Sequence, residues 1–493
     1  MKIFTLLSVV FPIVMGLIML AVRPRTRKAT NTYAIICVAI NSVFVFATIA
    51  NVILNGKEAA SMEIYQLSDY LKLAFSPDGP SLVFGCIIGT LWPITTIYAF
   101  SYMEHEHHPN KFFGFFVITY GVVAGIAFAG NFFTMYLCYE FMTLVTLPLV
   151  MHEMDDKARS AGRKYLIYSM TGAALIFVAI VFMMEYGTTL DFIYGGVLDM
   201  SKIGENLGLM QFVFVLGFFG FGVKAGIFPL HDWLPSASVA PTPVTALLHA
   251  VAVVKSGAFA VMRLIYYGFG TENLYGTTAQ AVVIVAASVT IVFGSSMALR
   301  APHLKRRLAY STVANLSYIL LAFAVMTPYG MTGGLLHMVF HAVIKISLFF
   351  CAGAVLHNTE LEYINDLEGL SRVMPVTCGV FVFASLALMG VPPLGGFTSK
   401  WVIATSAAML NSWPGIVGAC ALIVSAILTT LYMITCVVRF YFPLKDAKLV
   451  DHGHEASKLM TVPLIILCVL CLVLSLLSGW LCQILGAVAG GAI

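Results

Sequence analysis

The 493-residue chain is 60% hydrophobic and 10% charged, with a net charge of +4 and a mean hydropathy of +0.93. A soluble domain carries about 25% charged residues, so the composition excludes a soluble enzyme and predicts an all-α polytopic membrane protein. The net charge is too small to suggest a nucleic-acid partner.

Hydrophobic runs of about 20 residues, the length that crosses a bilayer, recur along the chain. The first has no small-residue cleavage site before the arginines that follow it, so we expect a membrane helix and not a signal peptide. The twelfth run is long, and the sequence PPLGG at 392–396 breaks it. In all we predict fourteen spans, at 3–22, 32–54, 81–102, 112–130, 132–151, 164–185, 211–230, 243–267, 279–299, 308–326, 333–356, 374–409, 415–438 and 460–486.

The basic residues support an even number of spans. Lys and Arg concentrate on the connections of one membrane face, and most of the 27 Lys and Arg residues fall on alternate connections. This alternation places both termini on the outer face of an inner or plasma membrane. The remaining basic residues are expected on the opposite connections (Lys2, Lys57, Lys72, Lys202 and Arg263) or within spans (Lys224, Lys255, Lys345 and Lys400).

Two spans broken by Gly and Pro indicate an internal duplication. The first reads FGFGVKAGIFP around Lys224, and the second reads LMGVPPLGGFTSK and ends at Lys400. Broken helices in corresponding positions point to a transport site built on inverted repeats, and an odd offset of five spans reverses the orientation as such a repeat requires. We expect N-terminal helices at 1–110, repeats at 111–267 and 279–440, and a last helix at 460–493.

Glu140 lies within the apolar run FFTMYLCYEFMTLVTLPLV, and Lys224 lies beside the first break. A charge at the bilayer centre costs about 2.5–3.5 kcal/mol on insertion scales, so each residue should have a partner, and the two suit each other. A change in their separation would move a proton on or off the lysine. The alternatives are an ion pair that only locks two helices and a lysine that reaches the membrane surface.

His249 and Lys255 share the eighth span. His337, His341 and Lys345 are spaced at i, i+4 and i+8, which aligns them along one helix face. Because imidazole titrates near neutral pH, this column predicts a water-linked proton relay. Histidines satisfied within the core, or a metal site, are the alternatives, and a nearby lysine disfavours the metal.

Lys400 follows the second break and could be where the proton enters or leaves; the alternative is an interfacial lysine. The His- and acid-rich segments 104–108 and 451–455 could bind a metal but also fit solvated loops. The only CxxC, Cys468 and Cys471, fits buried thiols on an apolar helix. Because no redox-cofactor motif is visible, we expect no cofactor on this chain.

Residues 80–440 resemble the antiporter-like proton-translocating subunits of respiratory complex I, membrane-bound hydrogenases and multisubunit Na⁺/H⁺ antiporters. The motifs that carry the resemblance are long and follow the same order. They are PLHDWLP, APTPVTALLHA, LKRRLAYSTVANLSY, HMVFHAVIKISLF, DLEGL and LALMGVPPLGGFTSKW.

The resemblance implies fourteen helices, with inverted five-helix repeats at helices 4–8 and 9–13 and broken seventh and twelfth helices. The matching functional positions are Glu140 (helix 5), Lys224 (helix 7), His249 and Lys255 (helix 8), His337, His341 and Lys345 (helix 11) and Lys400 (helix 12). The chain departs from the family at His303, where an aspartate is frequent. It also ends soon after the fourteenth helix, like the shorter family members.

These patterns predict a proton-translocating subunit of a redox-driven energy-converting complex. Its expected partners are other membrane subunits of that complex and the lipid bilayer, with H⁺ and possibly Na⁺ as the transported ions. One alternative is a subunit of a Na⁺/H⁺ antiporter without a redox module. The other is a structural subunit whose buried charges only support assembly.

Overall fold

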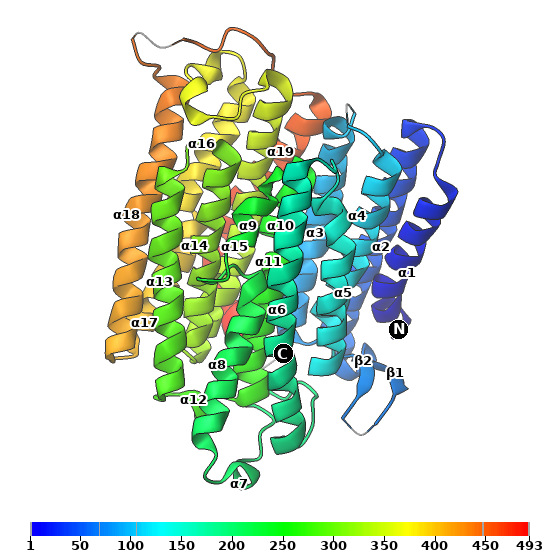
Figure 1. Cartoon of the computed structure of the whole chain (residues 1–493), viewed down its shortest axis with the longest axis vertical. Helices are drawn as coiled ribbons and strands as arrows, with labels where there is room; N and C mark the ends of the chain where they lie inside the picture. Colours follow the sequence, from blue (N-terminus) through cyan, green and yellow to red (C-terminus); the bar gives the residue numbers. More distant parts are fainter. Residues whose placement is uncertain (1, 69, 105, 446–447, 492–493) are drawn as a thin grey trace.

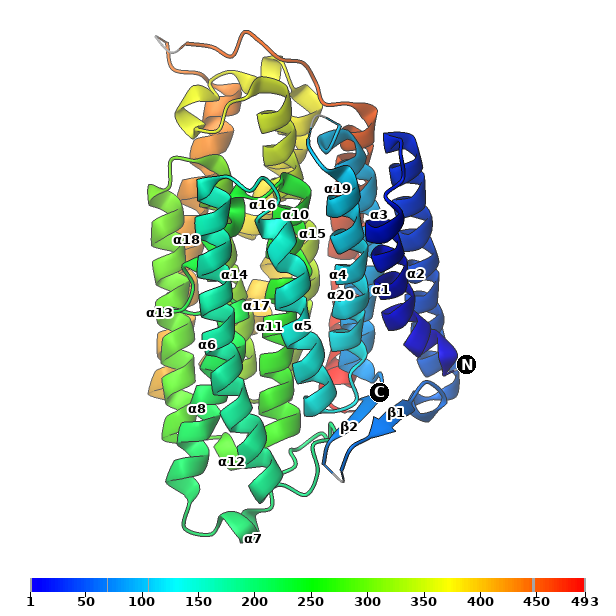
Figure 2. The ribbon, with the colours of Figure 1, turned by 45° about the vertical axis from the view of Figure 1, so that its right-hand side comes forward.

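The structure, a computed structural model, describes residues 2–68, 70–104, 106–445 and 448–491. Long helices run side by side along the longest axis of the molecule (Figure 1). The N-terminal helices lie together on one side of this bundle (Figure 2). They are α1 (Ile3–Val22), α2 (Arg27–Asn55) and α3 (Gly79–Tyr102).

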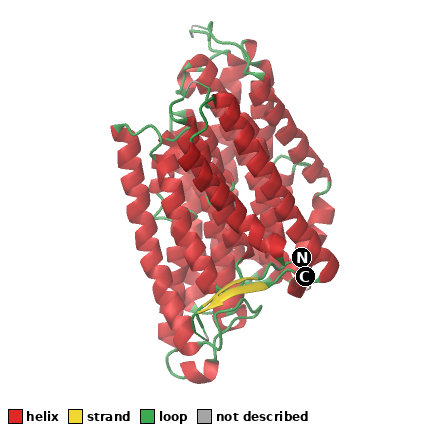
Figure 3. Cartoon of the chain, turned by 90° about the vertical axis from the view of Figure 1, so that its right-hand side faces the viewer, coloured by secondary structure: helices red, strands yellow, loops and turns green. Residues whose placement is uncertain are grey.

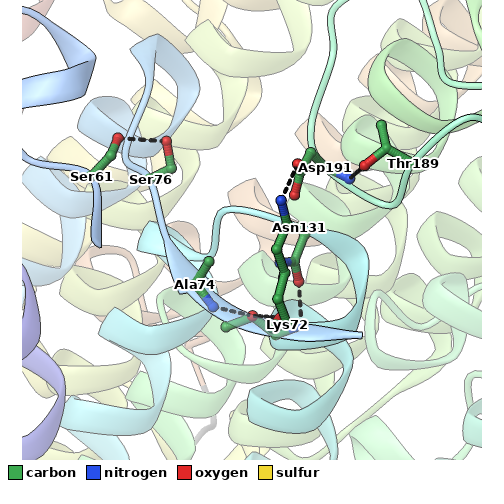
Figure 4. Close-up of polar contacts among 8 residues, drawn as sticks. Ser61, Lys72, Ala74, Ser76, Asn131, Thr189 and Asp191 are labelled. Carbon is green, nitrogen blue, oxygen red and sulfur yellow. Dashed lines mark hydrogen bonds and ion pairs between the residues drawn. The ribbon is translucent and has the colours of Figure 1, made fainter. Parts of the chain in front are cut away.

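A two-stranded hairpin, which the sequence analysis did not predict, precedes α3. A 3₁₀ turn, η1 (Lys57–Ala59), leads into β1 (Met62–Gln66), which pairs antiparallel with β2 (Lys72–Phe75). Figure 4 shows how β2 is held: Lys72 Nζ lies 2.6 Å from Asp191 Oδ2, and Asn131 Nδ2 donates to the Lys72 carbonyl at 2.9 Å. The strand therefore closes one end of the bundle (Figure 3).

The next helices form the first half of the main bundle. They are α4 (Pro109–Phe128), α5 (Phe132–Val150), α6 (Asp156–Tyr186), the short α7 (Met200–Ile203) and α8 (Leu207–Lys224). Asn131 caps α5 by accepting a hydrogen bond from the Thr134 amide at 2.7 Å. This cap permits the tight turn between α4 and α5.

The chain breaks where the Gly/Pro pattern predicts. α8 ends at Lys224, and α9 (Trp233–Ser236) and the 3₁₀ turn η2 (Ala237–Val239) follow the break. The eighth predicted span is itself interrupted at residues 251–252. It consists of α10 (Thr242–Ala250), α11 (Val253–Arg263) and a π-helical turn, η3 (Leu264–Phe269).

The second half is arranged around α15 (Pro328–Thr359), which packs against α3, α10, α14, α16, α17, α19 and α20. The predicted span at 374–409 is two helices, α16 (Pro375–Met389) and α17 (Gly395–Met409), separated by the PPLGG break. The 3₁₀ turns η4 (Ile364–Asp366) and η5 (Leu370–Arg372) precede α16. The other helices are α12 (Thr271–Leu274), α13 (Thr278–Arg300), α14 (Leu304–Ala324), α18 (Trp413–Tyr441), α19 (Lys458–Leu476) and α20 (Ser478–Ala489).

Twelve segments of the described chain are long and apolar enough to cross a membrane, so the chain is a multi-pass membrane protein. The predicted count of fourteen includes two further regions, α14 and the α16–α17 pair, which are not among the twelve. That count and the inverted repeats stay predictions. Both termini lie at the hairpin end of the bundle (Figure 2, Figure 3), as an even number of spans requires.

Candidate functional site

The structure brings Glu140 and Lys224 together from α5 and the end of α8. Lys224 Nζ lies 3.9 Å from Glu140 Oε1, and the lysine side chain is 1% exposed. The ammonium also donates to the Tyr139 carbonyl and sits 3.5 Å from the centre of the Tyr139 ring. Because the carboxylate is in ionic but not hydrogen-bonding contact, a small movement of α5 or α8 could make or break a direct bond.

The position of Lys224 is fixed by close packing at the break. An added Cβ on Gly257 of α11 would lie 2.7 Å from the Ala225 amide nitrogen and 2.9 Å from the Lys224 carbonyl carbon. Trp233 Nε1, beyond the break, donates to the Val223 carbonyl at 2.8 Å. The last turn of α8 is therefore held by α11 on one side and by the returning chain on the other.

Lys255 of α11 and His341 of α15 form a second buried contact. Lys255 Nζ lies 2.6 Å from His341 Nδ1, and both residues are at most 1% exposed. A hydrogen bond of this length between two titratable groups is a direct route for a proton. Sequence spacing alone did not indicate that these two residues would touch.

From His341 the polar groups continue along α15 toward α17. The rings of His341 and His337 have centroids 5.7 Å apart, and His337 Nδ1 lies 2.9 Å from Ser399 Oγ. Ser399 precedes Lys400, whose Nζ donates to the Leu388 carbonyl at 2.5 Å and so caps the C-terminus of α16. Ser399 was not singled out from the sequence, although its place beside Lys400 in a broken helix is a usable signal.

Lys345 and His249 take different directions. Lys345 Nζ donates to the Leu308 carbonyl at 3.0 Å and to the Ser311 hydroxyl, so it faces α14 and not the histidines. His249 is fully buried, and its ring centre lies 4.8 Å from that of Phe349 on α15. His249 and Lys255 thus both face α15, although their spacing on one continuous helix would separate them.

The site residues form two groups. Within the described residues, no hydrogen bond joins Lys224 to Lys255. The two groups are linked by packing, because Gly257 lies one half-turn beyond Lys255 and touches the Lys224 backbone. The described part of the chain contains no cluster of three His, Cys, Asp or Glu residues that could hold a metal.

One buried ion pair was missed. Arg263 was assigned to an outer connection, but it is 0% exposed at the end of α11 and binds both carboxylate oxygens of Asp78, the N-cap of α3. Its guanidinium carbon lies 4.4 Å from the ring centres of Phe192 and Tyr267. This pair joins the N-terminal helices to the helix that carries Lys255.

The polar connections make local contacts within the described residues. Glu455 of the 451–455 segment accepts from the Val376 amide at 2.6 Å and so caps α16, while Asp451 is exposed. His303, which stands where the family often has aspartate, lies 3.4 Å from Glu362. His105 of the 104–108 segment lies outside the described residues.

Comparison with known proteins agrees with the fold. A family model described as "NADH:quinone oxidoreductase/Mrp antiporter, TM" matches residues 129–429. The chain is 31% identical over 348 residues to NADH-quinone oxidoreductase subunit N of Desulforudis audaxviator, covering 70% of this chain and 68% of that protein. It is 30% identical over 438 residues to hydrogenase-4 component B of Escherichia coli, covering 84% of this chain but only 64% of that protein.

The architecture also matches a solved structure. A chain of the membrane-bound sulfane sulfur reductase, an archaeal respiratory membrane complex, superposes with a TM-score of 0.84 at 21% identity. The match covers 99% of this chain and 97% of that chain. The likeness therefore extends over nearly every described helix, including those outside the family match.

Proposed function

Because the chain belongs to the NADH:quinone oxidoreductase/Mrp antiporter family, we propose that it is a proton-translocating membrane subunit of a redox-driven energy-converting complex. It would sit in an inner or plasma membrane with both termini on the outer face. Its partners would be other membrane subunits of the same complex. The redox centres would lie on those partners, since this chain shows no motif for a cofactor.

The observation that carries this proposal is the direct contact of Lys255 with His341 inside the protein. Buried ionisable residues are costly in a membrane and mark ion pathways. Here one contact places a lysine at 2.6 Å from an imidazole whose ring centre lies 5.7 Å from that of a second, tilted imidazole. Ser399 then extends the line of polar groups from His337 to Lys400.

Glu140 and Lys224 would act as the switchable pair. When the two approach, the carboxylate stabilises the ammonium, and when they separate, the buried ammonium loses that stabilisation and releases its proton. The proton would pass to Lys255, and from there through His341 and His337 to Lys400. Water hydrogen-bonded to the ring nitrogens and to His249 would bridge the groups of this path that do not touch directly. Lys345 would supply a further proton-accepting group beside α14.

The test follows proton movement in inverted vesicles that hold the whole assembled complex. Glu140→Gln removes the charge that holds Lys224, so we expect electron-donor-driven acidification to fall at least about ten-fold. Glu185→Gln is the matched control, because Glu185 is exposed at the end of the neighbouring helix α6. Normal pumping by an assembled Glu140→Gln complex would overturn the proposal.

A subunit of a Na⁺/H⁺ antiporter without a redox module is the second candidate, since the family description also names an antiporter. Added Na⁺ would then drive proton movement in the vesicles without any electron donor. Pumping that requires a donor and continues without Na⁺ would support the redox-driven complex. If neutral variants pump normally once assembled, the buried charges serve assembly only.

A further inference from the structure

A cavity of about 740 Å³ lies where α1 ends and α4 begins, far from the charged groups described above. Ligand sites usually measure about 300–1,000 Å³, so the cavity has room for a small polar group. It lies at the end of the bundle opposite the two termini, because α1 starts at the terminal end and finishes here (Figure 2).

The cavity is basic. Arg23, Lys111 and His108 line it, and none of its described lining residues is acidic. In the described part of the chain, no ion pair engages Arg23 or Lys111. Within the described residues, Arg23 uses only its Nε in a hydrogen bond, as a donor to the Leu20 carbonyl at 3.3 Å. Two cationic groups therefore remain available to an anion.

His152 provides an independent sign of a ligand. The residue lines the cavity, is 5% exposed, and its Nε2 lies 2.8 Å from the His107 carbonyl, which must accept the bond. Its other ring nitrogen, Nδ1, is buried and has no partner among the described residues. Buried polar atoms are rarely left without a partner. Burial and the nearby Lys111 charge lower the pKa of His152, so in the absence of an anion the ring is neutral and Nδ1 is an acceptor. A bound phosphate would oppose both effects and let a protonated Nδ1 donate to a phosphate oxygen.

The first turn of α4 adds to the attraction. Pro109 and Lys111 lie in the first turn of this 20-residue helix and line the cavity. The N-terminus of a helix carries partial positive charge and free amide groups, which suit a phosphate. Basic side chains, an unpartnered imidazole and a helix N-terminus thus converge on one space.

Part of the remaining wall is apolar and lies on the membrane-spanning helices α1 and α4. Leu20 and Phe115 line it just beyond the point where α1 and α4 touch. That contact is so close that an added Cβ on Gly16 would lie 2.6 Å from the Gly114 carbonyl oxygen. A site that is basic at the membrane surface and apolar toward the bilayer fits a lipid better than a free ion.

We propose that this cavity binds the phosphate headgroup of an anionic phospholipid, with an acyl chain along Leu20 and Phe115. The lipid would join the end of α1 to the start of α4 and to the connection after α5, which carries His152. This site does not depend on the proposed function, because none of its residues belongs to the proton path.

The test compares lipids retained by the purified, assembled complex. We would reconstitute it in nanodiscs of phosphatidylcholine with phosphatidylglycerol as the minor lipid and identify retained lipids by native mass spectrometry. We expect a preference for phosphatidylglycerol that the double substitution Arg23→Gln/Lys111→Gln reduces by about thirty-fold, since each basic residue near an anionic lipid contributes roughly five-fold.

The matched control is Arg25→Gln/Lys28→Gln, which removes the same charge from exposed residues near the same end of α1 that do not line the cavity. Equal losses in both doubles would overturn the site in favour of general surface attraction. Equal retention of phosphatidylcholine would overturn the preference for an anionic lipid. Displacement of the lipid by millimolar inorganic phosphate would overturn the role of the apolar wall.

Discussion

The contact between Lys255 and His341 is the most specific feature of the proposed relay. Neither residue is exposed, so each side chain depends on the other as a hydrogen-bonding partner. A lysine in this position can do two things, supply a charge or release a proton. Two substitutions separate these roles, because arginine keeps the charge but does not release its proton in proteins.

We expect both Lys255→Met and Lys255→Arg to reduce donor-driven proton pumping about a hundred-fold, the usual contribution of a positioned acid or base. The measurement is acidification of inverted vesicles, normalised to assembled complex. Lys202→Met, which changes an exposed lysine outside the bundle, is the control. Retained pumping in the arginine variant would mean that only the charge of Lys255 matters.

At the residue scale, the sequence predicted which side chains are buried and charged better than which of them meet. Glu140 and Lys224 pair as expected, because each is a charged residue within an otherwise apolar run and the two signs are opposite. Lys255 and His341 were placed in one relay, but their contact depends on the break between α10 and α11, which has no Gly or Pro to announce it. Arg263 was misassigned because it lies near the end of a span, where basic residues usually reach the surface.

At the scale of elements, the backbone of Lys224 and Ala225 at the end of α8 packs directly against Gly257 of α11. We call this close contact the joint. Gly257 faces the Lys224 backbone at distances that no side chain tolerates. The backbone on the other side cannot rotate away as a flexible side chain could. Movement of α11 should therefore be transmitted to Lys224, and movement of the last turn of α8 should be transmitted to Lys255.

Gly257→Ala tests this joint. We expect it to cost about 1–3 kcal/mol of stability through overpacking and to impair pumping, because it displaces the Lys224 backbone and so changes the distance between Lys224 and Glu140. Gly208→Ala in α8 is the control, since an added Cβ there meets nothing within 4 Å and should be neutral or slightly stabilising. Thermal unfolding in detergent and vesicle acidification measure the two effects. Equal behaviour of the two variants would show that the joint is loose.

Helix breaks marked by Gly and Pro were predictable, and α14 was predicted as the span 308–326, but the β1–β2 hairpin and the break between α10 and α11 were not. The Gly/Pro patterns located the ends of α8 and α16 because both residue types interrupt helices. The β1–β2 hairpin was not predicted from the sequence, because β1 is short, mostly exposed and irregular between Glu63 and Tyr65. α14 carries three basic residues in its first turn and is less apolar than the other long helices. Neighbouring helices bury most of α14, so it need not present an apolar face to lipid.

At the scale of the whole molecule, basic residues and termini segregate to opposite ends. The structure places both termini beside the hairpin (Figure 3), and the basic connections that follow α1, α3 and α5 lie at the other end. The alternation of Lys and Arg along the sequence predicted this arrangement, because each membrane crossing carries the chain to the opposite face. The membrane orientation that it implies can be measured directly.

We expect a cysteine at Ser201, in the connection between α6 and α8, to react with an impermeant maleimide in intact cells. A cysteine at Arg25, in the connection after α1, should react only after permeabilisation. Both positions are exposed, and the unsubstituted protein with its ten native cysteines gives the background. Labelling of Arg25→Cys in intact cells, with Ser201→Cys protected, would invert the proposed orientation.

The ion pair of Asp78 with Arg263 also sets an order for biogenesis. The two residues are 185 positions apart in the chain, and ribosomes add about 5–20 residues per second. Asp78 therefore emerges roughly ten to forty seconds before its partner exists. Among the described residues no other ion pair reaches α3, so its electrostatic attachment to the main bundle can form only after α11 has been made.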